Sequence, residues 1–321
     1  MRVLVTGATG FVGRAVCGQL HDAGHTVVAA LRTSRAVAVS AHEVVVVGSI
    51  DGNTQWRQAL NDIDGVVHLA ARTHQGETAG AATAYRRLNA DASAQLARCA
   101  VAAGVTSFVY MSSIKVNGES SPLDNRGALR PLHGDDEPRP TTAYGRSKWE
   151  AEKVLQEIAG PTSMRLTMLR PPLVYGPGQK SNLDLLMRAV DNGIPMPFAG
   201  LDNRRSLIGV DNLASAVAVS LMTGPATPAI YTLADTDISS AKLVHAMARA
   251  LGRPARLFYF PPRLLRSLAK LTGRLTQLEK ITGSLIVDNE KFRAETGWVP
   301  TKSLEESLEA TVARYRAGDK Q

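Results

Sequence analysis

Short apolar runs alternate with longer stretches of helical periodicity over the first 170 residues of the chain. The apolar runs are rich in β-branched residues and predict buried strands. The expected strands are Arg2–Thr6, Thr26–Leu31, Val44–Val47, Gly65–Leu69, Ser107–Met111 and Met164–Leu169, and the expected helices are Phe11–Ala23, Ala79–Ala103 and Tyr144–Ile158. Strands that alternate with helices predict an α/β fold with a parallel sheet covered on both faces.

The alternation weakens after about Val174. The segment Pro171–Gly178 is rich in proline and glycine, and helical patterns return at Asn182–Asn192, Leu243–Leu251 and Ser303–Arg316. We therefore expect a sheet domain over residues 1–174 and a smaller substrate-binding portion over 175–321, laid over the carboxyl edge of the sheet. Some segments of this second portion can return to the main sheet.

Composition narrows the class of protein. The chain has 321 residues, of which 44% are hydrophobic and 21% charged, as in folded proteins. Two cysteines are too few for a disulfide framework, and no cysteine or histidine cluster has the spacing of metal ligands, so we expect no metal site. We find no signal peptide and no apolar run that could span a bilayer, and expect a cytoplasmic protein without stable membrane insertion.

The net charge of +8 indicates an anionic partner. The chain carries no nucleic-acid motif and its arginines are scattered, so we expect a phosphorylated substrate and cofactor rather than nucleic acid.

A glycine-rich loop joins the first expected strand to the first expected helix. Gly7 allows a sharp turn, Gly10 leaves room for a pyrophosphate, and Gly13 lets the helix pack closely on the strand. The helix N-terminus then offers free N–H groups to the phosphates. The alternative is a tight structural turn. In this position the loop favours a doubly wound, Rossmann-type dinucleotide-binding fold.

The end of the second strand bears on the choice between NAD and NADP. An acidic residue that binds the ribose hydroxyls of NAD is common there. This chain instead has Arg32 and Arg35, which could hold a 2′-phosphate. The alternative is that both are solvated loop charges. The sequence therefore slightly favours NADP over NAD.

Tyr144 and Lys148 stand four residues apart and share one face of an expected helix. A nearby ammonium and an oxidised nicotinamide both lower the pKa of a phenol, so Tyr144 could exchange a proton with a sugar hydroxyl or carbonyl. Ser113, just after the fifth strand, is expected to hold the carbonyl oxygen or the phenol proton. Such a pair alone arises by chance on amphipathic helices, but here it accompanies the glycine loop and the serine.

Together these motifs resemble the extended short-chain dehydrogenases/reductases, and the resemblance runs over nearly the whole chain. The exit of the sixth strand, Leu169–Gly178, is similar to the nucleotide-sugar branch, which includes UDP-hexose 4-epimerases, 4,6-dehydratases and 4-ketosugar reductases. The motifs that carry the resemblance are Thr6–Gly13, His68–Ala71, Asn89, Tyr110–Ser113, and Tyr144 with Lys148.

The resemblance implies a set of site residues. Arg205 also makes independent sense, because a guanidinium matches phosphate geometry. Phe198 could stack on uracil or simply pack in the core. The expected catalytic residues are Ser113, Tyr144 and Lys148; the cofactor-binding residues are Gly7, Thr9, Gly10, Phe11, Val12, Gly13, Arg32, Leu69, Ala70, Ala71, Asn89, Tyr144, Lys148 and Pro171; and the substrate-binding residues are Ser113, Asn182, Phe198 and Arg205.

The resemblance favours some enzyme activities of this branch over others. Dehydratases carry a Thr-Asp-Glu group where this chain has Ser113-Ile114-Lys115, so dehydration is disfavoured. The segments 203–207 and 283–288 are similar to reductases of UDP-4-keto-6-deoxy-N-acetylhexosamines of bacterial surface polysaccharide, which is the leading interpretation. The alternatives are a UDP-hexose 4-epimerase and, from another class, a non-enzymatic dinucleotide sensor. The resemblance also allows a homodimer.

One basic stretch has no place in this site. Arg263, Arg266, Lys270 and Arg274 interleave with Leu264, Leu265, Leu268 and Leu271. An ordinary helix with a solvated basic face is the preferred interpretation. The alternative is a surface helix that contacts anionic lipid.

Overall fold

A computed structural model of the chain describes residues 1–318 apart from 35–38, 74–79, 180–181, 226 and 274. Its centre is a seven-stranded sheet of strand order β3-β2-β1-β4-β5-β6-β9 in which every pairing is parallel. The strands are β1 (Arg2–Thr6), β2 (Thr26–Leu31), β3 (Glu43–Val46), β4 (Gly65–His68), β5 (Ser107–Met111), β6 (Arg165–Arg170) and β9 (Ala229–Thr232). The doubly wound, Rossmann-type fold expected from the sequence is confirmed.

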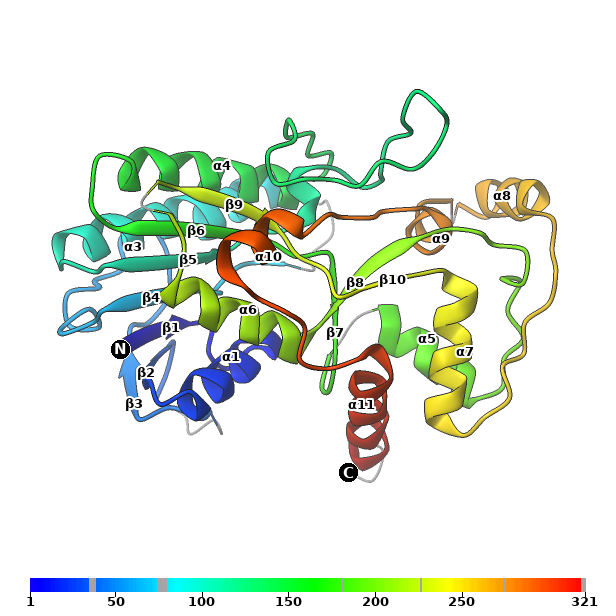
Figure 1. Ribbon diagram of the computed structural model, residues 1–321, viewed down its shortest axis with the longest axis horizontal. Helices are drawn as coiled ribbons and strands as arrows, with labels where there is room; N and C mark the ends of the chain where they lie inside the picture. Colours follow the sequence, from blue (N-terminus) through cyan, green and yellow to red (C-terminus); the bar gives the residue numbers. More distant parts are fainter. Residues whose placement is uncertain (35–38, 74–79, 180–181, 226, 274, 319–321) are drawn as a thin grey trace.

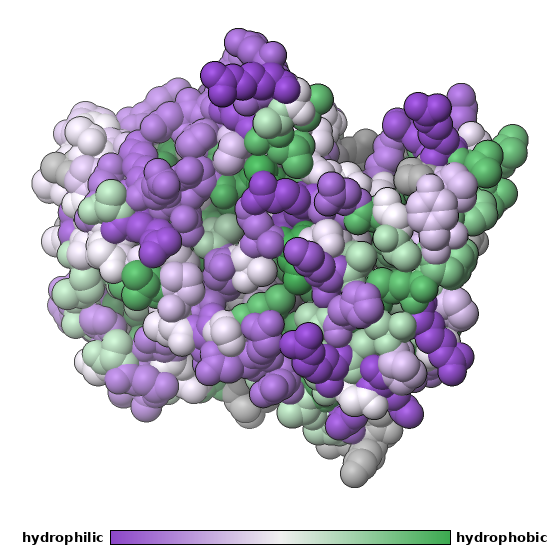
Figure 2. Space-filling model, turned by 45° about the vertical axis from the view of Figure 1, so that its right-hand side comes forward, coloured by the Kyte–Doolittle hydropathy of each residue, from purple (hydrophilic) through white to green (hydrophobic). Residues whose placement is uncertain are grey.

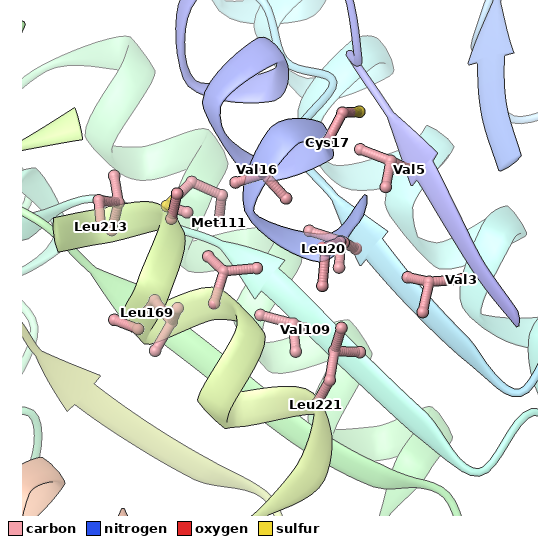
Figure 3. Close-up of a cluster of buried hydrophobic side chains, with 14 of the residues drawn as sticks. Val3, Val5, Val16, Cys17, Leu20, Val109, Met111, Leu169, Leu213 and Leu221 are labelled. Carbon is pink, nitrogen blue, oxygen red and sulfur yellow. The ribbon is translucent and has the colours of Figure 1, made fainter. Parts of the chain in front are cut away.

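Alternate residues along the strands face two separate apolar cores. Val3 and Val5 of β1 pack against α1 (Phe11–Asp22) and α6 (Val210–Met222), as Figure 3 shows. Leu4 points to the other face, in the core formed with α3 (Ala92–Ala102) and α4 (Ala143–Ala159). The sheet is thus sandwiched between two helical layers (Figure 1), which explains why its strands are apolar throughout.

The third strand differs from its expected burial. Val44 and Val46 are more than half exposed, whereas Val45 between them packs towards the core. The strand lies at the edge of the sheet and pairs with β2 alone. A β-branched run predicts a strand, but it does not tell an edge strand from a central one.

The expected helix Ala79–Ala103 is divided by a π-helical turn. Helix α2 (Ala81–Arg86) runs into the π turn Arg87–Asp91, and α3 follows without a break. Asn89 lies in that turn. Single π turns within α-helices are frequent at functional sites.

The rest of the chain builds a smaller layer beside the sheet. A three-stranded sheet of order β10-β8-β7 lies among helices α5, α7 and α11 (Figure 1). Its strands are β7 (Leu173–Tyr175), β8 (Arg205–Gly209) and β10 (Thr236–Ile238), and the helices of this portion are α5 (Asn182–Asp191), α7 (Ser240–Leu251), α8 (Pro262–Leu271), α9 (Leu275–Thr282), α10 (Glu290–Thr296) and α11 (Leu304–Gly318).

Several segments after residue 174 return to the main sheet. Strand β9 pairs with β6, α6 packs beside α1, and Phe292 of α10 lies in the same core. The sequence division at residue 174 left this return open. Among the described residues, no helix is both long and apolar enough to cross a bilayer.

Candidate active site

The loops that follow four of the strands lie at one edge of the main sheet. Because β1, β4, β5 and β6 are parallel and in register, their carboxyl ends align, with Thr6 beside His68 and His68 beside Tyr110. The strand order reverses between β1 and β4, and ligands of doubly wound sheets bind at such a reversal. Gly7, Leu69, Ser113 and Pro171 all follow these strand ends.

The glycine loop forms a cradle that side chains would fill. A Cβ on Gly13 would lie 2.1 Å from the Gly7 carbonyl oxygen, and one on Gly7 would lie 2.8 Å from the Ala70 nitrogen. Gly7 also has a φ of +69°, which glycine adopts at little cost. No side chain caps the N-terminus of α1, so its first N–H groups are available to a ligand. This cradle fits the pyrophosphate of a dinucleotide.

The other expected cofactor residues lie around this cradle. Thr9 is in the loop, and Phe11 and Val12 begin α1. The half-buried segment Leu69–Ala71 follows β4, while Arg32 is exposed just after β2. Arg35 lies outside the described residues.

Lys148 is buried on α4 beside the end of β5. Its Nζ donates a hydrogen bond to the Met111 carbonyl oxygen at 2.7 Å and lies 4.5 Å from the centre of the Tyr110 ring. Burial lowers the pKa of Lys148 to about 7, although Glu152 opposes this shift. A buried cation held by one carbonyl and a ring has further donors for a cofactor.

Tyr144 stands one turn before Lys148, at the start of α4. Thr142 caps this helix by accepting a hydrogen bond from the Gly145 N–H at 3.1 Å. A Cβ on Gly145 would lie 2.6 Å from the Lys115 carbonyl oxygen, so glycine lets the first turn of α4 approach the loop after β5. That approach brings Tyr144 to Ser113.

The fold favours the protonated form of the Tyr144 phenol. Burial raises its pKa to about 12, and a hydrogen bond with Ser113 lowers it only in part. A phenol can accept a substrate proton at neutral pH only if its pKa falls, and nearby positive charge does this. The Lys148 ammonium and an oxidised nicotinamide would supply that charge.

Behind the cradle lies a buried chain of hydrogen bonds that the sequence did not assign. The Ala70 N–H donates to Thr6 Oγ1 at 3.2 Å, and Thr6 Oγ1 lies 2.7 Å from His68 Nδ1. His68 Nε2 lies 2.9 Å from Ser93 Oγ, which donates to the Asn89 carbonyl oxygen. Because Ser93 uses its proton towards Asn89, His68 donates from Nε2 and accepts at Nδ1 from Thr6. Burial, with a smaller contribution from Lys148, lowers the pKa of His68 to about 3.

Asn89 continues this chain towards α4. Its Nδ2 donates to Ser147 Oγ at 2.9 Å and to the Arg72 carbonyl oxygen at 3.1 Å, while its Oδ1 accepts from the Arg72 N–H. Ser147 in turn donates to the Tyr144 carbonyl oxygen at 2.8 Å. Asn89 therefore ties the loop after β4 to the first turn of α4.

A second feature that the sequence did not reveal is a buried ion pair at the end of β6. Arg170 donates from Nε and Nη2 to the two carboxylate oxygens of Glu152 at 2.9 and 2.6 Å, and both side chains are 1% exposed. Arg170 Nη1 donates to Asn117 and to the Gly134 carbonyl oxygen. The motif Leu169–Gly178 contained Arg170, but its partner is on α4, which the pattern does not indicate. The pair joins β6, α4 and the loop after β5.

Apart from Ser113, the expected substrate residues lie on the second portion. Arg205 is half-buried at the start of β8 and donates to the Gly283 carbonyl oxygen at 3.1 Å. Burial lowers its pKa, and the ion pairs of the described residues do not include it. Arg204, by contrast, is paired with Asp237 at 3.0 Å. The hydrogen bonds of the described residues therefore leave Arg205 with further donors for an anion.

The other substrate and cofactor candidates are less informative. Phe198 is 7% exposed and packs in the apolar core of the second portion, which favours core packing over a uracil contact. Pro171 is buried, and its carbonyl oxygen accepts from the Ile114 N–H at 3.0 Å. Asn182 is the first residue of α5, and its side chain lies outside the described part of the structure.

Comparisons with known proteins identify the family of this chain and the solved structures that share its fold. A family model described as the NAD dependent epimerase/dehydratase family matches residues 3–234. The chain is 34% identical to a UDP-glucose 4-epimerase of Vibrio cholerae over 98% of this chain and 95% of that protein. It is 26% identical to an N-acetyl-alpha-D-glucosaminyl-diphospho-ditrans,octacis-undecaprenol 4-epimerase of Escherichia coli O157:H7, over 97% and 94%. The structure of MoeE5 in complex with UDP-glucuronic acid and NAD superimposes with a TM-score of 0.77 at 24% identity, covering 99% of this chain and 100% of that one.

Proposed function

Because this chain belongs to the NAD dependent epimerase/dehydratase family, we propose that it interconverts the C4 epimers of a UDP-hexose. The observation that carries the proposal is the arrangement of Tyr144, Ser113 and Lys148 beside the dinucleotide cradle. This group can remove a proton from a sugar hydroxyl and return it, which is the chemistry that both half-reactions of an epimerase need.

Each of these residues has a separate task. In the first half-reaction the Tyr144 oxygen would take the proton of the C4 hydroxyl while C4 is oxidised to a ketone. Ser113 donates a hydrogen bond to the ketone oxygen. In the second half-reaction C4 would be reduced again with the opposite configuration and Tyr144 would give the proton back to its oxygen, so no net oxidation would occur. When bound, the nicotinamide supplies the acceptance and return of the hydride.

Lys148 makes this proton transfer feasible at neutral pH. Its ammonium lies on the same helix face as Tyr144 and favours the phenolate through its charge. Its remaining donors bind the ribose of the cofactor. The cradle at Gly7, Gly10 and Gly13 holds the pyrophosphate.

The surroundings of Ser113 support epimerisation over dehydration. Elimination of water from a hexose needs an acid to protonate the departing hydroxyl. Ile114 is buried and apolar, and Lys115 forms an ion pair with Glu119 at 3.1 Å. The two residues after Ser113 therefore provide no carboxylic acid.

A UDP-linked hexose suits the charge of the second portion. Arg205 offers unused guanidinium donors, and a diphosphate matches them in charge and geometry. The Vibrio cholerae relative is named for UDP-glucose and the Escherichia coli relative for a diphospho-linked N-acetylglucosamine. Both names support a sugar on a diphosphate.

A second candidate is reduction of a UDP-4-keto-6-deoxy-N-acetylhexosamine. Arg32 favours it, because an exposed arginine after β2 suits NADP, and an exchangeable NADPH serves a net reduction. The same Tyr144, Ser113 and Lys148 would protonate the reduced oxygen. The relatives are named for epimerases, and we therefore rank epimerisation first. Their enzyme names also disfavour a dinucleotide sensor.

Cofactor titration separates the two candidates. The purified protein and its Arg32→Ala variant are each titrated with NAD and with NADP. If Arg32 holds a 2′-phosphate, Arg32→Ala weakens NADP about tenfold or more and leaves NAD unchanged. If Arg32→Ala weakens the binding of NAD and NADP equally, or weakens neither, Arg32 does not bind a 2′-phosphate. That result favours an NAD-dependent epimerase.

A further inference from the structure

Helix α8 presents leucines to solvent on the far side of the second portion. Leu264, Leu268 and Leu271 are 58%, 53% and 86% exposed. Their spacing of four and three residues places them on one face of the helix. Figure 2 shows apolar side chains at the right-hand extremity of the molecule, which carries α8 in Figure 1. An ordinary amphipathic helix that packs on the core would bury these leucines.

Among the described residues, one edge of the apolar half of α8 is covered. Ala269 is 9% exposed, Leu265 is half-buried, and the helix packs against α9. Leu264, Leu268 and Leu271 occupy the adjacent edge, which the described residues leave open. The segment that enters the helix adds Phe258 and Tyr259, which are 44% and 68% exposed.

The opposite edge of α8 is cationic. Arg263, Arg266 and Lys270 are all exposed. Arg266 is paired with Glu279 at 2.8 Å, while the ion pairs of the described residues include neither Arg263 nor Lys270. Arg274 lies outside the described residues. An exposed apolar face beside free cations matches the boundary of an anionic bilayer, where leucines enter the acyl region and basic side chains reach the headgroups.

We propose that α8 docks the protein on an anionic lipid surface through Leu264, Leu268 and Leu271. A second copy of the chain fits this face less well, because a symmetric contact would bring the same free cations together. Aromatic residues next to the helix suit the interface of a bilayer. The binding is peripheral, since α8 has only ten residues and is too short to span.

The position of α8 gives this docking a consequence for the site. Helix α9 follows α8 and ends next to Gly283, whose carbonyl oxygen accepts from Arg205. The proposed lipid face is therefore connected through one short helix to the proposed diphosphate end of the site. Docking would hold that end near the membrane.

Vesicle co-sedimentation of the full chain tests the proposal without requiring turnover. The vesicles are phosphatidylcholine alone and phosphatidylcholine with phosphatidylglycerol, each at low and high salt. We expect binding to the anionic vesicles that weakens with salt. Each of Leu268→Gln and Leu271→Gln should weaken it roughly tenfold, and each of Arg263→Gln and Lys270→Gln roughly fivefold.

Leu185→Gln on α5 is the matched control, because Leu185 is a helical leucine of similar exposure, at 65%. It should bind as the unaltered chain does. Hydrogen exchange of the unaltered protein provides a second measurement, in which anionic vesicles protect the amides of α8. The proposal is overturned by no binding at low salt, by equal binding of Leu268→Gln and Leu185→Gln, or by no protection of α8. A dimer in sedimentation velocity that Leu268→Gln dissociates would assign the face to a second copy instead.

Discussion

The Lys148 ammonium donates a hydrogen bond to the Met111 carbonyl oxygen across 2.7 Å. This bond links α4 to the end of β5 and holds the Lys148 Nζ beside the Tyr110 ring. The surrounding apolar residues lower the pKa of Lys148 to about 7 from an ordinary value of 10.5. Strongly shifted pKa values are concentrated at functional sites, so the lowered pKa of Lys148 supports its assignment to the candidate site.

The first prediction concerns the pH dependence of stability. Between about pH 7 and 10 the unfolded chain keeps the Lys148 proton while the folded chain releases it, so the free energy of unfolding rises with pH. In Lys148→Met this contribution is absent. The difference in free energy of unfolding between the unaltered chain and Lys148→Met should change by about 3 kcal/mol over that range. Urea unfolding at several pH values measures it. Lys153→Met, an exposed position on the same helix, is the control and should follow the unaltered chain. A constant difference for Lys148→Met would contradict the buried-cation account.

Tyr144→Phe removes the hydroxyl that exchanges the substrate proton. Turnover should fall by about 10²- to 10⁴-fold, whereas cofactor affinity and the melting temperature should change little, because the ring is retained. Steady-state kinetics, dinucleotide titration and thermal melting measure the three quantities. Tyr259→Phe, at an exposed tyrosine outside the site, should keep full turnover. Comparable turnover of both variants would remove Tyr144 from the mechanism.

His68 should make the fold sensitive to acid. Its pKa is lowered to about 3 from an ordinary value of 6.5, so between these values the unfolded chain binds a proton that the folded chain does not. Stability therefore falls as the pH falls below 6.5, by about 2 to 3 kcal/mol at pH 4.5.

The comparison variants for this prediction are His68→Gln and His245→Gln. His68→Gln should cost about 1–3 kcal/mol at pH 7 through its lost hydrogen bonds and show a shallower acid dependence. His245 is exposed on α7, and His245→Gln should behave as the unaltered chain. The stability of each protein is measured from its denaturant midpoint at pH 7 and at pH 4.5. An equal loss of stability in His68→Gln and in the unaltered chain would show that His68 does not cause the acid sensitivity.

Gly13→Ala should damage the dinucleotide cradle. Its Cβ would lie 2.1 Å from the Gly7 oxygen and 2.8 Å from the Ala8 Cα, so α1 must move away from the loop. We expect cofactor affinity to fall by about 100-fold or more, as α1 no longer presents its N–H groups to the phosphates. Gly18→Ala on the same helix meets nothing within 4 Å and should stabilise the protein by about 0.5–1 kcal/mol with affinity unchanged. Calorimetric titration decides, and equal affinities for the two variants would show that the cradle does not hold the cofactor.

Local patterns explain how much of this molecule its sequence predicts. The strand before Gly7 and the spacing of Tyr144 and Lys148 are short-range features, so they predict the fold and the centre of the candidate site. The bond from Thr6 to His68 joins residues 62 apart, and that from Arg170 to Asn117 joins residues 53 apart. Their partners become neighbours only when the parallel strands align.

Exposure was harder to predict than structure type. The valines of β3 have the composition of a buried strand, but the strand lies at the sheet edge. The leucines of α8 have the periodicity of a core-facing helix, but in the described part of the chain Leu264, Leu268 and Leu271 are exposed. Periodicity identifies the apolar side of an element, and only the tertiary arrangement shows what covers it.

Proton NMR of a UDP-hexose incubated with the protein tests the central claim most directly. UDP-glucose and UDP-N-acetylglucosamine are each incubated in D2O with NAD, and their anomeric and C4 signals are followed over time. Epimerisation through Tyr144 predicts that the C4 epimer of at least one sugar appears, with no net reduction of NAD and no deuterium at C4, because the hydride returns from the cofactor. The claim is contradicted if neither epimer forms while a UDP-4-keto-6-deoxy-N-acetylhexosamine is reduced at the expense of NADPH.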